Sequence, residues 1–421
     1  MTAEKEMNNY KEFTRMLIRH LDSFPKVPRK QWEEIAMHYV NGVAADELRR
    51  LISLEQRRAS GAFFTEHELA KKVLQHHKFL FDRNPVFYDP SCGTANLLLA
   101  AQEIYTKELD NIGLKYELLG TDIHKEFIQA SKARLSMNDI LLGGSGSNFT
   151  FDFLIADGMK DNDFYKKATH IVVNPPFNLI EACKEDIWTS GKVSAAAVFI
   201  DRIIKHIRPG TQVVAILPEV LRCGSRYEKW RRQIEKSCKI IGHQQLGQFD
   251  EHADIDVFSI LLEKREDEES EDAYPWVERA SDGQMVEDFF DVSIGPVVDN
   301  RDPQRGKKRP YLKSRGLQGW TEVQHWPNFR KHEGRFFTSP FIVIKRTSRV
   351  GELNRATAAI INIPEPVYVD NHLIVLSPKT GKLSDCRNLL KVLKEERTDN
   401  WINSQIRCRH LTVKAVSKIP I

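Results

Sequence analysis

Short apolar segments rich in β-branched and aromatic residues alternate with helical segments between residues 86 and 264 of this 421-residue chain. Strands separated by helical crossovers form parallel sheets that carry helices on both faces. The alternation therefore predicts an α/β fold with a doubly wound, mostly parallel, seven-stranded sheet. The seven predicted strands are residues 86–90, 117–122, 149–158, 170–176, 211–219, 239–246 and 257–264.

Polar side chains follow four of these strands, at Asp89, Asp122, Asp157 and Asn174. Ligands of such sheets bind beyond the carboxyl ends of the strands. After the first strand, Gly93 permits a sharp turn and the next helix offers free N–H groups to an anion. Each aspartate alone could be a helix cap, but polar groups after four strands favour a nucleotide-like ligand, with Asp122 at the ribose and Asp157 at an adenine amino group.

The fourth strand runs into Asn174-Pro175-Pro176-Phe177. An amino group conjugated to a ring is a weak nucleophile, because its lone pair is delocalised. If the ligand is S-adenosylmethionine, the Asn174 side-chain oxygen and the Pro175 carbonyl can each accept one N–H and direct the lone pair at the methyl group. The prolines fix φ and lack N–H groups, which stiffens the loop, and Phe177 offers a ring on which an extruded base can stack.

Five segments occur in a characteristic order: "GAFFTEHELAKKVL" (61–74), "DPSCGTANLL" (89–98), "GTDIH" (120–124), "ADG" (156–158) and "NPPF" (174–177). With them the chain resembles the gamma class of DNA adenine-N6 methyltransferases, which includes type I modification subunits and type II and IIG restriction-modification methyltransferases. The resemblance spans roughly residues 60–264. It implies the class I S-adenosylmethionine-dependent methyltransferase fold.

The resemblance also implies roles for individual residues, and it implies no metal. The cofactor S-adenosyl-L-methionine would be held by Phe64, Thr65, Asp89, Cys92 and Gly93 at its methionine end, by Asp122 and Ile123 at the ribose and adenine, by Asp157 and Gly158 at the adenine amino group, and by Asn174. The target base would be carried by Asn174, Pro175, Pro176 and Phe177. Phe249 would pack against the flipped base, unless it is a core residue.

Two positions depart from the family pattern. Ala95 stands where the family usually has a second glycine in the cofactor turn, and its methyl group narrows that turn. Glu66 follows Thr65 where proline is common. The first departure leaves open whether the chain binds the cofactor strongly.

Charge divides the chain unevenly. Residues 301–421 carry 24 Lys and Arg against 10 Asp and Glu, a net +14, whereas residues 1–300 carry a net −10. This asymmetry indicates a polyanionic partner for the C-terminal part. Lys345, Arg346 and Arg349 are candidate phosphate contacts, or ordinary surface charges. Aromatic residues that can stack on bases or lie in the core are Trp320, Trp326, Phe329, Phe336 and Phe337.

We expect four parts: a helical N-terminal segment (1–56), a catalytic domain (57–265), an acidic linker (266–300) and a basic α+β target-recognition domain (301–421). The last resembles the recognition domains of such enzymes. The polar N-terminus, the lack of a long apolar run and six scattered cysteines without a CxxC pair favour a cytoplasmic protein. The resemblance implies a bacterial or archaeal one, associated with the nucleoid through DNA.

The resulting hypothesis is a site-specific DNA methyltransferase that acts on the N6 amino group of adenine in duplex DNA, by base flipping and direct displacement. A restriction-modification or phage-defence setting is expected, with duplex DNA and, in some arrangements, a specificity or restriction subunit as partners. Three alternatives stay open. The chain could methylate RNA, or protein glutamine, whose amide has the same lone-pair problem, or it could be a catalytically weak DNA-binding subunit of a larger complex.

Overall fold

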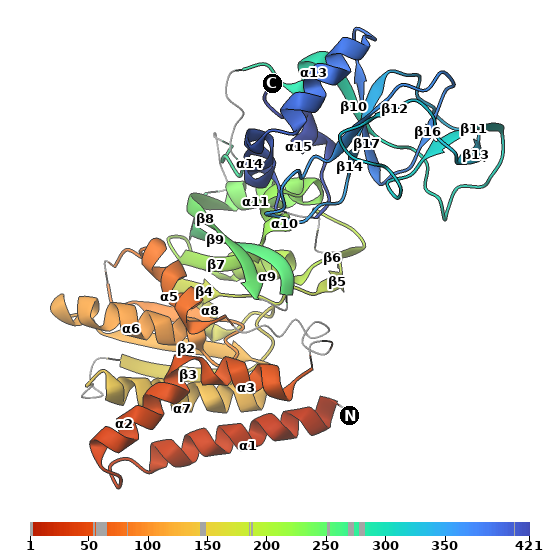
Figure 1. Ribbon diagram of the computed structural model, residues 1–421. Coiled ribbons are helices and arrows are strands. Elements are labelled where there is room, and N and C mark those ends of the chain that lie inside the picture. Colours follow the sequence, from red (N-terminus) through yellow and green to blue (C-terminus); the bar gives the residue numbers. More distant parts are fainter. Residues whose placement is uncertain are drawn as a thin grey trace. The chain divides into compact units, whose positions relative to one another are not determined.

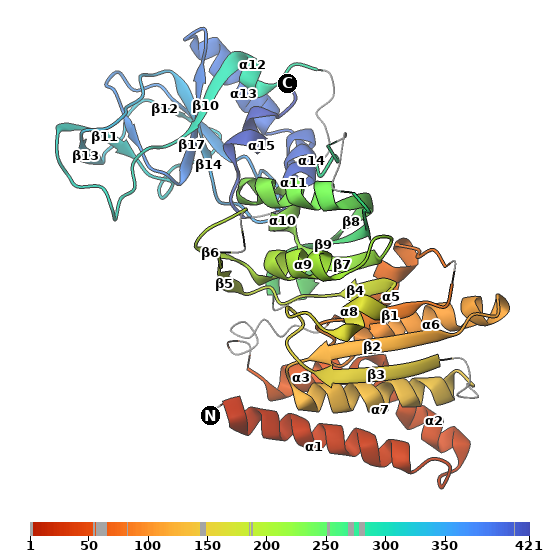
Figure 2. The ribbon, with the colours of Figure 1, turned by 180° about the vertical axis from the view of Figure 1, so that it is seen from behind.

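A computed structural model describes residues 3–53, 55, 65–81, 83–143, 149–184, 186, 188–250, 253–267, 273–277, 283–407 and 409–421. The chain divides into two compact units, which we call unit 1 (Met1–Tyr274) and unit 2 (Pro275–Ile421). Each unit is described by itself (Figures 1 and 2). Within the ranges given above, no helix is long and apolar enough to cross a membrane.

A seven-stranded sheet with the order β3-β2-β1-β4-β7-β9-β8 forms the centre of unit 1. The strands from β3 to β7 are parallel, and β9 and β8 continue the sheet in antiparallel pairing. The predicted fold class and its seven strands are therefore confirmed. The strands are β1 (Val86–Asp89), β2 (Tyr116–Asp122), β3 (Phe149–Ile155), β4 (His170–Val173), β7 (Gln212–Pro218), β8 (Cys238–Asp250) and β9 (Ala253–Lys264).

Helices cover both faces of this sheet. Figure 1 shows α5 (His67–His76) and α6 (Asn96–Asn111) on one face, and Figure 2 shows α8 (Asp163–Lys167) and α9 (Ala195–His206) on the other. Every residue of the central strands β4 and β7 is buried, as expected for parallel strands covered on both sides. The remaining helices after β1 are α7 (Lys125–Leu141), α10 (Glu219–Cys223), the 3₁₀ turn η2 (Ser225–Tyr227) and α11 (Glu228–Ser237).

The described residues before α5 form α1 (Ala3–Asp22), α2 (Arg29–His38), the π-helical turn η1 (Tyr39–Val43) and α3 (Ala44–Leu51). The first three pack on α7 at one end of the sheet, and α3 packs on α1 and η1. The Tyr10 ring meets the Phe127 ring edge-on at a centroid distance of 5.1 Å, and the Thr14 hydroxyl donates to the Glu126 carbonyl at 3.3 Å. The N-terminal helices are thus part of unit 1.

Arg134 of α7 is fully buried and joins these helices to the turn that follows β1. Its Nε donates to the Tyr39 carbonyl at 3.0 Å, and its Nη2 donates to the Val40 carbonyl at 2.7 Å. Its Nη1 donates to the Asn96 Oδ1 atom at 2.7 Å and to the Thr94 carbonyl. Burial lowers the pKa of Arg134 to about 10, so that the guanidinium is still charged at neutral pH. One buried cation therefore satisfies four acceptors from two parts of the chain.

Unit 2 is an α+β structure with two sheets, of order β10-β17-β14-β15-β12 and β13-β11-β16. Its apolar centre includes Trp326, Phe337, Phe341 and Val375. The strands are β10 (Phe290–Ile294), β11 (Lys307–Leu312), β12 (Glu322–Val323), β13 (Phe329–His332), β14 (Phe341–Lys345), β15 (Ala358–Ile361), β16 (Tyr368–Val369) and β17 (Leu373–Pro378). The helices are α12 (Val286–Phe289), α13 (Leu383–Leu393), α14 (Glu396–Gln405) and α15 (Val413–Ser417).

The division between the units differs from the boundaries expected from the sequence. It falls at Tyr274 and Pro275, inside the segment 266–300 that was expected to be a linker. That segment also contains α12 and β10, and β10 pairs antiparallel with β17 from Phe290 opposite Pro378. The partner strand lies about 80 residues further along the chain, so that local acidic composition alone suggested a solvated loop.

We expect Arg134→Met to lower the free energy of unfolding by about 3 kcal/mol, because four buried acceptors lose their donor at once. Urea unfolding of both proteins measures the change. Lys132→Met, an exposed position on the same helix, is the control and should change stability by less than about 0.5 kcal/mol. Equal losses for the two variants would show that the buried network contributes nothing.

Candidate active site

The ends of β1, β2, β3 and β4 meet at one edge of the sheet in unit 1. Pairing continues past the strands, since the Cys92 N–H donates to the Thr121 carbonyl at 2.9 Å and the Ala156 N–H to the Asp122 carbonyl at 3.0 Å. A cavity opens at this edge, and its lining comprises Thr65, Asp89, Ser91, Cys92, Gly93, Thr94, Asn96, Leu97 and Asn174. Five residues predicted from the sequence therefore line one cavity. Phe64 lies outside the described residues.

The turn between β1 and α6 has two residues in the left-handed region, Gly93 at φ +51° and Ala95 at φ +65°. Left-handed backbone costs an L-residue about 1–2 kcal/mol, whereas glycine adopts it freely. Ala95, fully buried, thus holds the conformation that a glycine would take. The contacts on either side fix it, because both the Thr94 carbonyl and the Asn96 side chain bind Arg134. The departure at Ala95 therefore leaves the path of the turn intact and raises its free energy.

Asp89 is a buried carboxylate, 2% exposed, at the end of β1. Its Oδ1 accepts a hydrogen bond from the Ser91 N–H at 3.0 Å. Burial raises the pKa of Asp89 well above its usual range, since the charged form has lost most of its hydration. Within the described part of the chain, no Lys or Arg forms an ion pair with it. A buried carboxylate on a cavity wall without a cation suits a ligand that brings an ammonium group.

Asp122 ends β2 and lies beside the same turn. Its Oδ2 accepts from the Gly93 N–H at 3.1 Å, and its Oδ1 accepts from the His124 N–H at 2.8 Å. Burial raises the pKa of this carboxyl group as well. Each carboxylate oxygen can accept a second hydrogen bond, so that the group suits a pair of hydroxyls. The neighbouring Ile123 is 64% exposed and offers an apolar surface there.

The third strand end places Asp157 and Gly158 next to the turn after β1. The Asp157 Oδ1 accepts from the Met159 N–H at 3.0 Å. Any side chain at position 158 would collide with the Pro90 carbonyl, since an added Cβ would lie 1.8 Å from its oxygen. Gly158 is therefore required for the close packing of two strand ends.

Asn174 follows β4, and its carboxamide is held in one orientation. Its Nδ2 donates to the Thr65 Oγ1 atom at 2.9 Å. The Thr65 carbonyl in turn accepts from the Asn96 Nδ2 atom at 2.5 Å, and Asn96 also binds Arg134. A continuous set of hydrogen bonds thus runs from Arg134 through Asn96 and Thr65 to Asn174, and it fixes which end of the Asn174 amide is the donor and which, Oδ1, is the acceptor. Sequence reasoning did not single out Asn96 or Arg134.

Burial of the Cys92 thiol, with help from the nearby Asp122 and Asp89 carboxylates, raises its pKa well above the usual value. The thiol is therefore neutral at physiological pH and a poor nucleophile. In the residues that the structure describes, no three His, Cys, Asp or Glu side chains come together as metal ligands.

Phe177 and Phe249 lie in contact at the same end of the sheet. Their ring centroids are 5.3 Å apart and the rings meet edge-on at 77°. Phe177 is 8% exposed and Phe249 is 5% exposed. Pro175, which directly follows Asn174 in the chain, is also buried. Phe249 belongs to β8, at an irregular register of its pairing with β9. The structure therefore brings the two predicted aromatic residues together, although their burial is also that of core residues.

The candidate phosphate contacts of unit 2 differ in exposure. Lys345 and Arg346 are half-buried at the end of β14, and the Arg346 Nη1 atom lies 3.4 Å from the Asn371 carbonyl. Arg349 is exposed, with its Nε 3.9 Å from a Glu352 carboxylate oxygen. An exposed pair at this distance contributes little to stability, so Arg349 is available to a partner.

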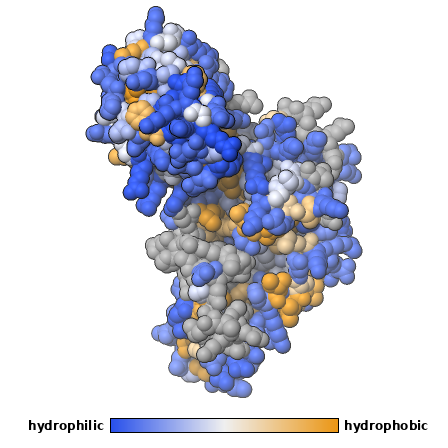
Figure 3. Space-filling view, turned by 90° about the vertical axis from the view of Figure 1, so that its right-hand side faces the viewer, coloured by the Kyte–Doolittle hydropathy of each residue, from blue (hydrophilic) through white to orange (hydrophobic). Residues whose placement is uncertain are grey.

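Four of the five aromatic residues near the basic segment 301–315 fall into two groups, and the fifth, Trp320, is half-buried. Trp326 and Phe337 belong to the core of unit 2. Phe329 and Phe336 are exposed, and basic groups lie over their rings, Lys308 at 5.6 Å and Arg309 at 4.4 Å from the centroids. Small groups of hydrophobic residues interrupt a largely hydrophilic surface on the face shown in Figure 3.

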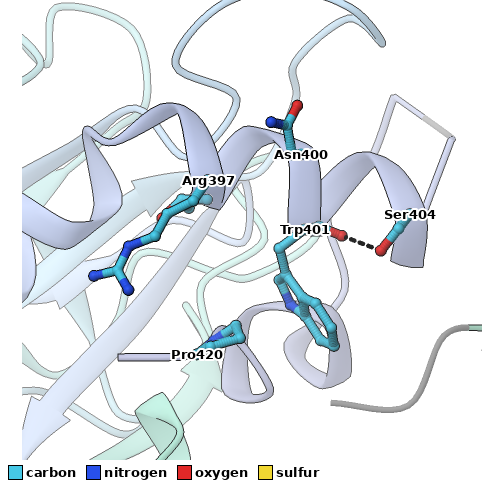
Figure 4. Close-up of a pocket in the computed structure, with 6 residues that line it drawn as sticks. Arg397, Asn400, Trp401, Ser404 and Pro420 are labelled. Atoms are coloured by element: carbon cyan, nitrogen blue, oxygen red, sulfur yellow. Dashed lines mark hydrogen bonds between the residues drawn. The ribbon is translucent and has the colours of Figure 1, made fainter. Parts of the chain in front are cut away.

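A separate cavity of about 420 Å³ lies in unit 2, along α14 (Figure 4). Its lining comprises Arg397, Thr398, Asn400, Trp401, Ser404 and Pro420. The Ser404 hydroxyl donates to the Trp401 carbonyl at 2.8 Å, which is a bond within the helix. A guanidinium, an amide and an indole suit binding of a ligand.

We expect both Ala95→Gly and Ala100→Gly to lower the free energy of unfolding, measured with urea. The loss for Ala95→Gly should be smaller by about 1–2 kcal/mol. Both changes remove a buried methyl group and add backbone freedom to the unfolded chain. Only the first also relieves left-handed backbone, because Ala100 lies within α6. Equal losses would mean that position 95 is not strained.

Comparison with known proteins gives one family. Residues 48–280 match the family described as N-6 DNA Methylase, whereas no curated protein sequence matches the chain. Similar solved structures include a type I restriction-modification methyltransferase subunit from Streptococcus thermophilus, with 18% identity over 53% of this chain and 50% of that chain and a TM-score of 0.37. The type I enzyme EcoKI M protein has 16% identity over 60% and 61%, with a TM-score of 0.35.

The type IIG restriction endonuclease BpuSI is similar over 92% of this chain and 61% of its own length, with 12% identity and a TM-score of 0.47. This chain thus spans 50% to 61% of the length of these three proteins. Scores of this size add nothing to the fold that the strand order gives. The family match covers more than half of the chain and includes the whole seven-stranded sheet and the Asn174–Phe177 segment, and the chain therefore belongs to the N-6 DNA methylase family.

Proposed function

We propose that the protein is a site-specific methyltransferase that transfers the methyl group of S-adenosyl-L-methionine to the N6 atom of adenine in duplex DNA. The observation that carries the proposal is the Asn174 carboxamide, which Thr65 holds in the lining of a cavity. The same lining contains the buried carboxyl group of Asp89, with which no Lys or Arg of the described residues forms an ion pair. An acceptor held rigidly beside such a cavity is what transfer to an amino group requires.

The residues of the cavity, together with Asp122, Ile123 and Asp157 at the neighbouring strand ends, fit this cofactor. Asp89 would pair with the ammonium of its methionine part, next to Thr65, Cys92 and Gly93. Asp122 would accept from the ribose hydroxyls, and Ile123 and Asp157 would contact the adenine ring and its amino group. When bound, the cofactor supplies a methyl group activated by a sulfonium centre. Phe64 is assigned by resemblance alone.

The residues of the protein position the amino group of the target. The Asn174 Oδ1 atom and the Pro175 carbonyl accept its two N–H bonds, and the lone pair then points at the methyl group. Positive charge develops on that nitrogen as the new bond forms, and two fixed oxygen dipoles stabilise it. Direct displacement needs no protein nucleophile, which agrees with the neutral Cys92 thiol.

The target adenine has to leave the duplex, because its amino group is paired there. Unpairing and unstacking cost a few kcal/mol. A base lying against Phe177, with Phe249 behind it, would recover part of this free energy through stacking. The buried contact between the two rings keeps Phe177 in place for that role.

The basic residues from 301 onward, with net charge +14, would bind DNA phosphates, with Lys345, Arg346 and Arg349 among the contacts. BpuSI and the EcoKI M protein are restriction or modification proteins by description. We therefore extend the proposal to a cytoplasmic restriction-modification or phage-defence setting, in which a specificity or restriction subunit can be a partner.

We expect Asn174→Ala to reduce methyl transfer into duplex DNA by at least about 100-fold, since one of two preorganised acceptors is lost. Cofactor binding, measured by calorimetry, should be largely kept. Asn111→Ala, an exposed position at the end of α6, is the matched control and should transfer at the rate of the parent. A fully active Asn174→Ala protein would remove the case for this residue.

A further inference from the structure

Unit 1 has a second open cavity, of about 640 Å³, between the loop of a short hairpin and the start of α11. The hairpin consists of β5 (Leu179–Glu181) and β6 (Lys192–Ser194). The lining comprises Trp188, Thr189, Ser190, Ser225, Arg226, Glu228, Lys229 and Arg232. None of these residues belongs to the active site described above.

Residues 225–232, in η2 and the start of α11, form one wall of the cavity, and their exposed face is mostly basic. Lys229 and Arg232 are exposed on α11, one turn apart, whereas Trp230 and Ile234 of the same helix are buried. Arg226, just before the helix, donates from Nη2 to the Ser190 carbonyl at 2.8 Å and so ties the two walls together.

Acidic groups neutralise only part of this charge. Glu228 is the one acid among the described residues of the lining, and its carboxylate lies 2.7 Å from Arg232. Asp186, two residues before Trp188, is buried and lies 2.7 Å from the Arg202 guanidinium, so its charge is already balanced. The described residues of the lining thus hold three cations and one anion, which favours an anionic ligand.

The lining also offers neutral hydrogen-bond donors. The hydroxyls of Thr189, Ser190 and Ser225 belong to it and suit an oxyanion. Trp188 is 5% exposed and its indole N–H is closed to solvent, so its ring contributes an apolar part of the wall and no hydrogen bond to a ligand.

The cavity lies close to the segment that is proposed to carry the target base. The hairpin begins directly after Phe177 and Asn178, and the Ala195 N–H donates to the Asn178 carbonyl at 2.9 Å. At its other side the Ser194 N–H donates to the Tyr227 hydroxyl at 3.0 Å. The hairpin has three paired positions, and a strand rises about 3.4 Å per residue, so its loop lies roughly 10 Å from Asn178. That length is about three nucleotide steps along one DNA strand. Figures 1 and 2 show the hairpin at this edge of the sheet.

We propose that this cavity binds a backbone phosphate of the DNA strand that carries the target adenine. Arg226, Lys229 and Arg232 would supply the charge, and the hydroxyls of Thr189, Ser190 and Ser225 would supply hydrogen bonds. The catalytic unit would then hold its substrate on both sides of the flipped base, independently of the basic residues from 301 onward. This inference rests on the proposed function, because it takes duplex DNA as the substrate.

The test is the salt dependence of duplex binding by the full chain, measured by fluorescence anisotropy. We expect the double variant Lys229→Gln/Arg232→Gln to reduce the slope of log K against log salt by about one, the amount of one phosphate contact. Lys236→Gln, an exposed lysine of α11 outside the cavity, is the control and should keep the slope of the parent. An unchanged slope in the double variant overturns the inference.

Glu228→Gln should change affinity in the opposite direction. Removing this carboxylate raises the net charge of the lining and releases Arg232, so we expect duplex binding at low salt to tighten by about threefold or more. Unchanged or weaker binding would count against a phosphate in this cavity.

Inorganic phosphate distinguishes a strand phosphate from a free anion. Trp188 fluorescence, taken as the difference between the parent and Trp188→Phe, should respond to duplex at concentrations where inorganic phosphate has no effect. A response to inorganic phosphate alone, with an unchanged DNA slope, would identify a free-anion site and overturn the inference. A changed slope in a protein that methylates no adenine would instead leave this inference standing and refute the proposed function.

Discussion

The structure of the active site depends on one buried cation. The Arg134 guanidinium satisfies four acceptors, two from the N-terminal helices and two from the turn after β1. Through Asn96 and Thr65 the same hydrogen-bond network reaches the carboxamide of Asn174. A buried charge of this kind is stable only when acceptors surround it, so Arg134 couples the N-terminal helices to the turn and, through the turn, to the Asn174 loop. The N-terminal helices are therefore part of the machinery that orients Asn174.

This network explains how the turn tolerates alanine at position 95. The left-handed backbone of Ala95 is unfavourable by itself, but Arg134 holds the peptide groups on both sides. Asp89, next to the turn, is likewise unfavourable in isolation, because it is buried and no Lys or Arg of the described residues forms an ion pair with it. Both features raise the free energy of the protein without ligand. Asp89 lines the cavity, so a cationic ligand bound there would offset the cost of burying it.

Much of this site could be predicted from the sequence, because it is encoded locally. Each strand end is a short apolar run followed by a polar residue, and parallel pairing brings Asp89, Asp122, Asp157 and Asn174 to one edge. The role of Arg134 was not predicted, because its hydrogen-bond partners lie 38 to 95 residues away in the sequence. A single arginine in a helix also suggests a surface position. Its place on the apolar face of α7, between Ala130 and Met137, was the one available signal. The strand β10 escaped for the same reason, since its partner β17 is distant in sequence.

The central claim is that the Asn174 loop methylates the amino group of adenine in DNA. The most direct measurement is to incubate the full chain with S-adenosylmethionine labelled in the methyl group and with duplex DNA, RNA and protein in separate reactions. Digestion of the duplex to nucleosides should then give labelled N6-methyladenine as the product. Label found only in RNA or in protein glutamine would contradict the account, and so would duplex binding without transfer to any substrate.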